Sequence, residues 1–254
     1  MTTPPTAPDT WIRRYHQAPD SAVQLVCFPH AGGSASFYFP VSTALSPAVE
    51  VSAVQYPGRQ DRRAEPNIDS LPALADAIFP AVRPLADRPL AFFGHSMGAL
   101  LAYEVALRLE QDGAPPLTRL YVSGRRAPSR YRPEVVHRQG DAGIIAELRR
   151  LSGTNADLLG DPETLEMILP AVKSDYKAVE TYEHTPGRSV SCPISAMIGD
   201  SDAKVTAEEA NAWAEHTTGP FEMRTFPGGH FYLVDQSAQI IGLISADLAP
   251  ARQS

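Results

Sequence analysis

The sequence predicts an α/β fold in which a mostly parallel central sheet is flanked by helices and carries a helical insertion. Short apolar segments alternate with helical patterns along most of the chain, which is typical of βαβ units. The segment 126–188 breaks this alternation and contains only helical patterns. The length of 254 residues suits a single domain spanning 1–254, without a structural metal or disulfide.

Six short segments rich in apolar side chains are predicted to be strands. Each is bounded by turn residues or by a helical pattern, as expected for buried strands of a parallel sheet. The predicted strands are 23–28, 49–55, 90–93, 119–123, 194–198 and 222–226.

Five helices are predicted between and after these strands, near 35–45, 70–86, 97–111, 206–217 and 236–248. Two of them have clear end signals. Asp112-Gly113, after 97–111, is typical of a helix C-terminus. Thr206 and Glu209 have the spacing of a capping box, in which the two side chains bind backbone N–H groups at the helix start.

The insertion 126–188 is predicted to contain the helices 141–151, 161–169 and 170–182. Asp161-Pro162 has the pattern of an N-cap followed by a first-turn proline. Pro170 is expected to interrupt or kink the helical pattern. A helical insertion between strands of a parallel sheet commonly covers the active-site end, so we interpret it as a lid. The alternative is an insertion that only enlarges the core.

Composition and charge exclude several classes of protein. The net charge of −7 argues against general binding to nucleic acid or membrane surfaces. The N-terminus lacks the basic start and apolar stretch of a secretory signal, and no apolar run is long enough to span a membrane. We therefore expect a soluble, cytoplasmic protein that is a monomer, with residues 1–9 disordered.

The strongest chemical signal is Gly94-His95-Ser96-Met97-Gly98, which follows a predicted strand and opens a predicted helix. A serine on such a strand–turn–helix is pushed out of the backbone toward a base and a substrate carbonyl. The motif arises by chance in other proteins, so its context matters. In this context Ser96 is predicted to be a catalytic nucleophile.

A serine nucleophile needs a base, and His230 has the best position for one. It lies in Gly228-Gly229-His230, a glycine-rich loop after the last predicted strand. Its Nε2 would take the Ser96 proton and return it to the leaving group. His95 is a poor base because adjacent side chains at a turn diverge.

An acid that orients the histidine should lie between nucleophile and base in this fold. Gly199-Asp200-Ser201-Asp202 follows the predicted strand 194–198 and lies in that interval. Both Asp200 and Asp202 are candidates from position alone. Asp200 has the alternative role of capping the turn through the backbone.

The tetrahedral intermediate of acyl transfer also needs an oxyanion hole. One donor is expected to be the backbone N–H of Met97, at a helix N-terminus. The second is expected to be the N–H of Ala31, in a His-Ala-Gly-Gly loop after the first predicted strand. No zinc, phosphate-loop or dinucleotide motif occurs in the sequence, so we expect no metal and no cofactor.

Together these motifs resemble the type II thioesterases that accompany modular polyketide synthases and nonribosomal peptide synthetases. The resemblance extends from about Trp11 to the last helix. It is carried by Phe28-Pro29-His30-Ala31-Gly32-Gly33, Tyr56-Pro57-Gly58-Arg59, Gly94-His95-Ser96-Met97-Gly98-Ala99, Ser123-Gly124-Arg125, Gly199-Asp200-Ser201-Asp202 and Gly228-Gly229-His230-Phe231. One departure is Ala203, where the family pattern has a proline.

The resemblance implies an α/β-hydrolase fold and a Ser96–Asp202–His230 triad. It implies hydrolysis of aberrant or stalled acyl groups from the phosphopantetheine thiol of carrier proteins, which would be the partners. The acyl group would lie under the lid near Met97, Phe37 and Tyr176. Five arginines either meet an acidic carrier protein or are ordinary surface or structural residues: Arg59, Arg62, Arg63, Arg125 and Arg126.

Other functions remain open on the sequence. An esterase or fatty-acyl thioesterase acting on free small molecules would use the same triad. A chain-terminating thioesterase that cyclises its product is disfavoured by the absence of an attached carrier domain. A non-catalytic binding protein on the same fold is a more remote alternative, because the expected triad and both elbow glycines are present.

Overall fold

The computed structural model describes residues 10–152 and 161–249, so the prediction for residues 1–9 lies outside the described residues. Its centre is a seven-stranded sheet with the order β1-β3-β2-β4-β5-β6-β7. The strands are β1 (Ile12–Arg13), β2 (Val23–Phe28), β3 (Val49–Val54), β4 (Leu90–His95), β5 (Arg119–Ser123), β6 (Ile194–Gly199) and β7 (Phe221–Phe226). The pairs from β3 to β7 are parallel, and only the short edge strand β1 pairs antiparallel, with β3.

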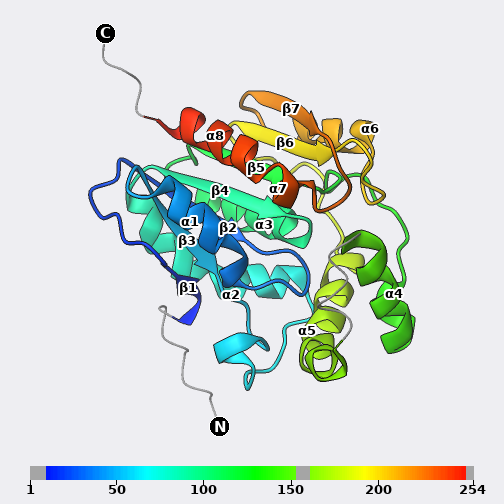
Figure 1. Cartoon of the computed structure of the whole chain (residues 1–254). Helices are drawn as coiled ribbons and strands as arrows, with labels where there is room; N and C mark the ends of the chain where they lie inside the picture. Colours follow the sequence, from blue (N-terminus) through cyan, green and yellow to red (C-terminus); the bar gives the residue numbers. More distant parts are fainter. Residues whose placement is uncertain (1–9, 153–160, 250–254) are drawn as a thin grey trace.

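Helices cover both faces of this sheet, as Figure 1 shows. On one face lie α2 (Leu71–Val82) and α3 (Met97–Gln111), which pack on each other and on the central strands. On the other lie α1 (Phe39–Leu45) and α8 (Ser237–Leu248). Shorter elements complete the chain: η2 (Ala35–Tyr38), η3 (Gln60–Arg62), η4 (Arg83–Asp87), α6 (Ala207–Asn211), η7 (Ala212–His216) and α7 (Tyr232–Asp235).

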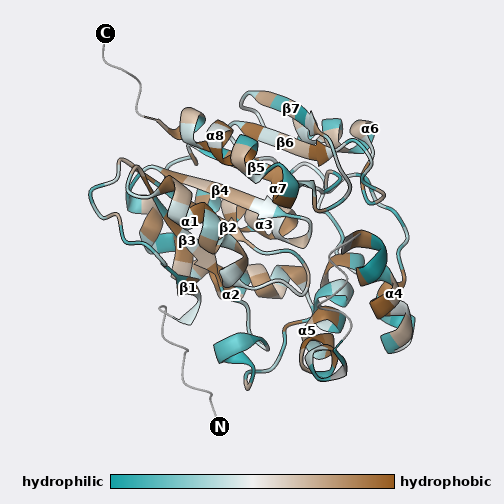
Figure 2. Ribbon diagram, in the orientation of Figure 1, coloured by the Kyte–Doolittle hydropathy of each residue, from teal (hydrophilic) through white to brown (hydrophobic). Residues whose placement is uncertain are grey.

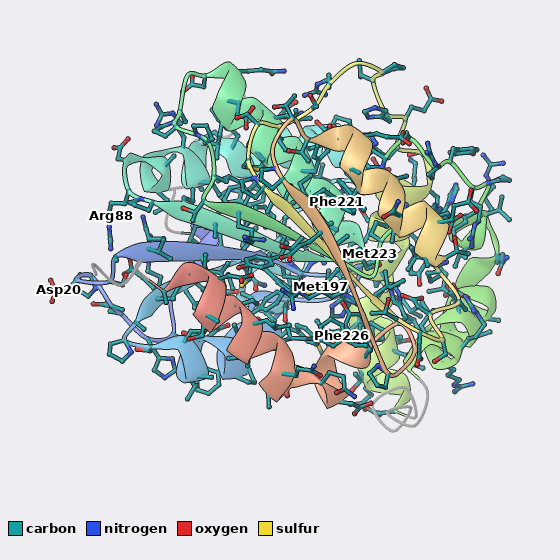
Figure 3. All side chains as sticks on the ribbon, turned by 90° about the horizontal axis from the view of Figure 1, so that it is seen from above. Asp20, Arg88, Met197, Phe221, Met223 and Phe226 are labelled. Atoms are coloured by element: carbon teal, nitrogen blue, oxygen red, sulfur yellow. The ribbon has the colours of Figure 1, made fainter. Side chains whose placement is uncertain are left out.

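The central strands are buried on both faces, so their apolar side chains alternate between two cores. On β4, Phe92 packs on the α2–α3 side and Phe93 on the α1–α8 side. The hydropathy colouring in Figure 2 shows these strands as largely apolar. Toward β7 the same alternation places Phe221 and Met223 on the opposite side of the sheet from Phe226 (Figure 3).

The insertion consists of η5 (Val136–Arg138), α4 (Gly140–Ser152) and α5 (Pro162–Glu180), and no strand occurs in its described part. α4 and α5 stand together beside the end of the sheet toward which β4 and β6 point (Figure 1). Asp161 caps α5 as predicted, because its carboxylate accepts the N–H of Thr164.

Pro170 does not end a helix, and the prediction of separate helices 161–169 and 170–182 is wrong. α5 runs through Pro170 without a break. A proline removes one backbone hydrogen bond, but residues on either side of it face the same apolar cluster. Leu169, Val172 and Tyr176 are buried there against Ile144 of α4. Tertiary packing therefore overrides the local signal.

The predicted α/β fold is confirmed, and most element boundaries agree within two residues. The capping box of Thr206 and Glu209 is present, and both cysteines are buried and free. Strand β1 and the short helices η3, η5 and α7 were not predicted, because such brief elements have no periodicity to detect. No helix of the described segments is long and apolar enough to cross a membrane.

Candidate active site

Ser96 lies at the turn between β4 and α3, as the elbow motif predicts. Its backbone has φ 55° and ψ −116°, a strained conformation for a non-glycine residue. Its N–H donates to the carbonyl oxygen of Ser123 at the end of β5, at 2.8 Å. From Leu90 to Leu107, Ser96 is the only residue that is not buried. The turn therefore leaves the side chain of Ser96 accessible to solvent and substrate, while its neighbours in the sequence are buried.

The flanking glycines allow this turn because backbone approaches backbone there. A Cβ added to Gly94 would lie 2.1 Å from the carbonyl oxygen of Gly98. A Cβ added to Gly98 would lie 2.0 Å from the carbonyl oxygen of Phe28. Neither neighbour can give way, since both contacts are to backbone, so the elbow requires glycine at both positions.

His230 and Asp202 are joined by a hydrogen bond between the loops that follow β7 and β6. Nδ1 of His230 lies 2.9 Å from Oδ2 and 3.1 Å from Oδ1 of Asp202. Both side chains are buried, and Oδ1 of Asp202 also accepts the backbone N–H of Lys204 at 2.8 Å. This arrangement holds the carboxylate against the ring and leaves Nε2 of His230 on the opposite side.

Asp200, the other candidate acid, has a different role. Its carboxylate accepts the N–H of Gly228 at 3.0 Å, which joins the loop after β6 to the loop after β7. Asp200 is exposed, and its side chain makes no hydrogen bond to His230 in the described structure. The geometry thus separates an acid that contacts the histidine from one that holds the loop.

Ser96 and His230 both lie at the carboxyl-terminal end of the parallel strands. The ring centroids of His95 and His230 are 5.0 Å apart, and both rings adjoin Gly124, next to the residue that binds the Ser96 N–H. Ser96 makes no hydrogen bond to His230 among the described residues. Such catalytic contacts are often long without substrate.

Two further histidines surround His230 as neutral rings. Burial lowers the pKa of His95 well below its ordinary value and that of His30 to about 3, and the nearby His230 adds to both effects. Nδ1 of His95 contacts Oγ of Ser123 at 2.9 Å, and that hydroxyl contacts the Tyr232 hydroxyl at 2.7 Å. His95 is thus engaged away from Ser96, consistent with its being a poor base.

Of the two expected oxyanion donors, Met97 directly follows Ser96 and Ala31 lies in the loop after β2. Met97 is the first residue of α3, a fifteen-residue helix whose N-terminus favours an anion. Ala31 follows β2, next to the segment that contacts Gly98. Among the described residues, neither backbone N–H donates to a protein acceptor, whereas the N–H groups of Gly32 and Gly33 both do.

The arginines are mostly buried, so the suggestion that they meet a carrier protein fails for four of the five. The four, Arg59, Arg62, Arg125 and Arg126, are at most 9% exposed. Arg62 lies over the Trp11 ring and pairs with Glu65, and Arg126 pairs with Glu134. Only Arg63 is exposed.

A charge network that the sequence analysis missed links the insertion to the loop of Asp202. Nζ of Lys204 contacts Glu134 at 2.5 Å and Glu147 of α4 at 2.9 Å. Burial would raise the pKa of Glu134, but hydrogen bonds from Lys204 and Arg126 hold it at about 2. No local pattern predicts this network, because its members are far apart in the sequence.

The residues expected to hold the acyl group belong to three different apolar clusters. Phe37 packs edge-on against His30 and lines an apolar cavity of about 330 Å³ beside α1, α7 and α8. Tyr176 is buried in the separate cluster between α4 and α5. Met97 is completely buried in the α2–α3 core.

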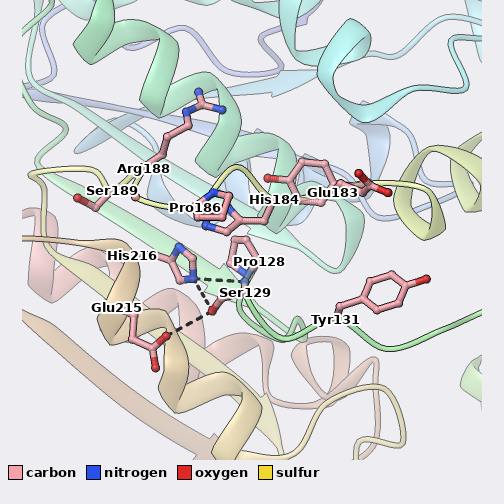
Figure 4. Close-up of a pocket in the computed structure, with 12 residues that line it drawn as sticks. Pro128, Ser129, Tyr131, Glu183, His184, Pro186, Arg188, Ser189, Glu215 and His216 are labelled. Carbon is pink, nitrogen blue, oxygen red and sulfur yellow. Dashed lines mark hydrogen bonds between the residues drawn. The ribbon is translucent and has the colours of Figure 1, made fainter.

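Another serine–histidine contact, away from Ser96, lies in a pocket of about 560 Å³ (Figure 4). Nε2 of His216 lies 2.9 Å from Oγ of Ser129, and burial lowers the pKa of His216 to about 4. Ser129 is in a loop rather than at a strand–helix elbow. None of Ser96, Asp202 and His230 lines this pocket. The described residues contain no cluster suited to a metal ion.

Comparisons with known proteins identify the family of this chain. The family model "Thioesterase domain" matches residues 23–248. The chain is 54% identical to a probable cadicidin biosynthesis thioesterase of Streptomyces griseus, over 97% of this chain and 69% of that protein. It is 52% identical to thioesterase PikA5 of Streptomyces venezuelae, over 95% of this chain and 86% of that protein.

Among solved structures, the type II thioesterase BorB from the borrelidin biosynthetic cluster superposes with a TM-score of 0.90. It is 51% identical, and the match covers 96% of this chain and 99% of BorB. The resemblance to type II thioesterases is confirmed, and with it the α/β-hydrolase fold. The chain therefore belongs to the thioesterase family and is a hydrolase of thioesters.

Proposed function

We propose that the protein removes aberrant or stalled acyl groups from the phosphopantetheine arm of carrier proteins, with Ser96, His230 and Asp202 as its catalytic triad. The observation that carries the triad is the 2.9 Å contact between His230 and Asp202 at the sheet edge where the strained Ser96 turn lies. The carrier-bound substrate is supported by the relatives, which include thioesterases named for cadicidin biosynthesis and for the borrelidin biosynthetic cluster.

In this mechanism Oγ of Ser96 attacks the thioester carbonyl while Nε2 of His230 takes its proton. Asp202 holds the ring through Nδ1 and stabilises the imidazolium. The N–H groups of Ala31 and Met97 bind the oxyanion. The proton then passes to the thiol, which leaves, and a water molecule activated by His230 hydrolyses the acyl-enzyme.

The insertion would act as a lid over this site. Each of its two long helices contacts a loop that carries a proposed catalytic group. α4 reaches the Asp202 loop through Glu147 and Lys204, and α5 reaches the loop of Ala31 through Asp175.

The test compares release of butyryl groups from a butyryl-phosphopantetheinyl carrier protein, from the N-acetylcysteamine thioester and from an oxygen ester. Ser96→Ala should abolish release from all three, with folding unchanged. Ser129→Ala is the matched control, because Ser129 also contacts a histidine but lies outside the proposed site, and it should keep full activity. Faster Ser96-dependent turnover on the carrier supports the proposal. Activity on free esters with the carrier ignored would contradict the carrier substrate, and activity in Ser96→Ala would contradict the triad.

A further inference from the structure

The segment Tyr56-Pro57-Gly58-Arg59 has no role in the mechanism above, yet it leads to a buried ion pair beside the proposed oxyanion hole. Arg59 is 9% exposed and Asp175, on α5, is 1% exposed. The guanidinium binds both carboxylate oxygens, with Nη1–Oδ2 at 2.6 Å and Nη2–Oδ1 at 2.9 Å. A paired fork of this kind is both strong and directional.

The same two side chains also hold the loop after β2. Oδ2 of Asp175 accepts the N–H of Gly32 at 2.7 Å, and Nη1 of Arg59 donates to the carbonyl oxygen of Gly33 at 3.1 Å. On the other side of Ala31, the Tyr56 hydroxyl donates to the carbonyl oxygen of Pro29 at 3.0 Å. The backbone around Ala31 is therefore held from both directions.

Helix α5 also packs directly against this loop. Gly32 has φ +75°, and a Cβ added to it would lie 2.7 Å from Cγ2 of Val172, one turn before Asp175 on α5. Only glycine allows the helix to come this close, so the loop conformation and the position of α5 depend on each other.

Arg59 remains charged in this setting. Burial would lower the pKa of Arg59, but the charge of Asp175 and its hydrogen bonds raise it above the ordinary value. A buried pair of charges is costly to assemble and gives little net stability. The more important contribution of this ion pair is therefore to fix the positions of the groups that it binds.

We propose that Asp175 and Arg59 are positioning residues for catalysis, which fix the loop after β2 so that the Ala31 N–H points at the oxyanion formed on attack by Ser96. The inference rests on the proposed function. It assigns to the insertion a part in the chemical step, through an ion pair that connects α5 to the loops after β2 and β3. Loss of the pair should weaken binding of the transition state far more than binding of the substrate.

The test uses Asp175→Asn and Arg59→Lys, which keep the size and polarity of the site but remove its paired charges or its fork. Glu104→Gln is the matched control. Glu104 is a carboxylate on α3 that is 2% exposed and accepts from Tyr182 at 2.7 Å, and it contacts neither catalytic loop. All three variants lose a buried charged contact, and the melting temperature reports the structural part of each change.

Three measurements separate positioning from a structural role: kcat and KM on butyryl-N-acetylcysteamine, the affinity for butyl boronic acid, and substrate binding in a Ser96→Ala background. The boronic acid takes the Ser96 oxygen to form a tetrahedral anion that resembles the intermediate. We expect kcat of Asp175→Asn and Arg59→Lys to fall about 10- to 100-fold, with KM and substrate binding changed less than about threefold. Boronic acid affinity should fall in parallel.

The controls make each outcome decisive. Glu104→Gln should keep kcat and boronic acid affinity within about twofold, even where its melting temperature falls as far as that of the other variants. Equal losses in all three variants, or unchanged boronic acid affinity in both positioning variants, would overturn the inference alone. If Asp175→Asn does not fold, Arg59→Lys decides. Equal boronic acid binding by wild type and Ser96→Ala would overturn the triad and the inference with it.

Discussion

The parallel sheet and the helical insertion are stabilised by different combinations of apolar and charged contacts. In the sheet, every residue of β2, β3, β4 and β6 is buried, and two large apolar cores cover its faces. The insertion has a small cluster of its own, Val136, Ile144, Leu169, Val172 and Tyr176. It is joined to the rest of the molecule both by apolar side chains in the main core, such as Val179 and Tyr182, and by charged side chains such as Asp175 and Glu147.

This difference teaches what each kind of contact decides. Apolar burial supplies most of the stability and tolerates small shifts, because it is not directional. Hydrogen-bonded ion pairs contribute little net stability but fix distances and angles. The sheet therefore brings Ser96, His230 and Asp202 to one edge, and the ion pairs of the insertion hold the loops around them.

The largest expected effect lies at the carboxyl ends of the strands. Asp202→Asn removes the negative charge and introduces an NH₂ donor that favours the wrong tautomer of His230, so kcat should fall about 10³- to 10⁴-fold with little change in stability. Asp200→Asn touches only the Gly228 N–H and should change kcat less than about threefold. Steady-state kinetics on the butyryl thioester compares the two. A larger loss in Asp200→Asn would reverse the assignment of the acid.

The next comparison separates the stabilities of the two regions. Phe92 is completely buried on β4 and packs against Phe28, so Phe92→Ala should cost about 3–5 kcal/mol. Ile144→Ala, in the insertion, should cost about 2–4 kcal/mol. We expect the insertion to open without the sheet. Phe92→Ala should then speed amide exchange only in the strands, whereas Ile144→Ala should speed it in both regions.

Amide hydrogen exchange measured by mass spectrometry, with urea unfolding for the total free energy, checks this pair. The control is Lys173→Met, which removes an exposed pair between α4 and α5 and should leave both exchange patterns unchanged. If Phe92→Ala speeds exchange in 140–152 and 162–180 as much as in the strands, the insertion and the sheet unfold as one cooperative unit.

The same division explains what could be predicted from the sequence. Strands 23–28 and 119–123 were predicted with their exact bounds, because apolar runs and turn residues are local signals. Pro170 misled the prediction, since the local cost of a proline was outweighed by packing between α4 and α5. Strand β1, with two residues, had no pattern to detect.

At the site, the elbow around Ser96 and the loop of His230 have local sequence signatures, so their places at the sheet edge could be predicted. Asp175 and Lys204 could not, because each acts through a partner far away in the chain. Nor could the burial of Arg59 and Arg126, since a charged residue in a loop has no pattern that distinguishes a surface position from a buried ion pair.

Acid should act on the buried histidines before it acts on Glu134 of the insertion. Burial lowers the pKa of His95 and of His216, the latter to about 4, so the unfolded chain binds protons that the folded protein does not. Stability from these histidines is present above about pH 6.5 and falls as the pH drops, for His216 by about 2 kcal/mol between pH 7 and pH 5. The insertion's Glu134, with its pKa held at about 2, contributes stability that is lost only below about pH 4.5.

Urea unfolding at pH 7, 6 and 5 measures how the free energy of unfolding changes with pH. In the His216→Gln variant, this pH dependence should be smaller by the contribution of one histidine. An unchanged slope in that variant would show that His216 does not titrate as a buried neutral ring. The insertion gives a second check. The Glu134→Gln variant should follow the wild-type slope in this range and depart from it only in stronger acid.

The smallest effect should come from an exposed ion pair of the insertion. Lys177 of α5 pairs with Asp69, and both side chains are 52% exposed. Such pairs contribute about 0–1 kcal/mol and are screened by salt. Lys177→Met should therefore leave kcat within about twofold and lower the free energy of unfolding by less than about 1 kcal/mol. This difference in stability should disappear in roughly 1 M salt, because charges more than about 3 Å apart are then screened from each other. Since Asp175 lies on the same helix but is buried against the loop of Ala31, a loss of kcat in Lys177→Met as large as that in Asp175→Asn would mean that any weakening of α5 impairs catalysis. Burial of the ion pair, rather than its presence, is what we expect to separate the two variants.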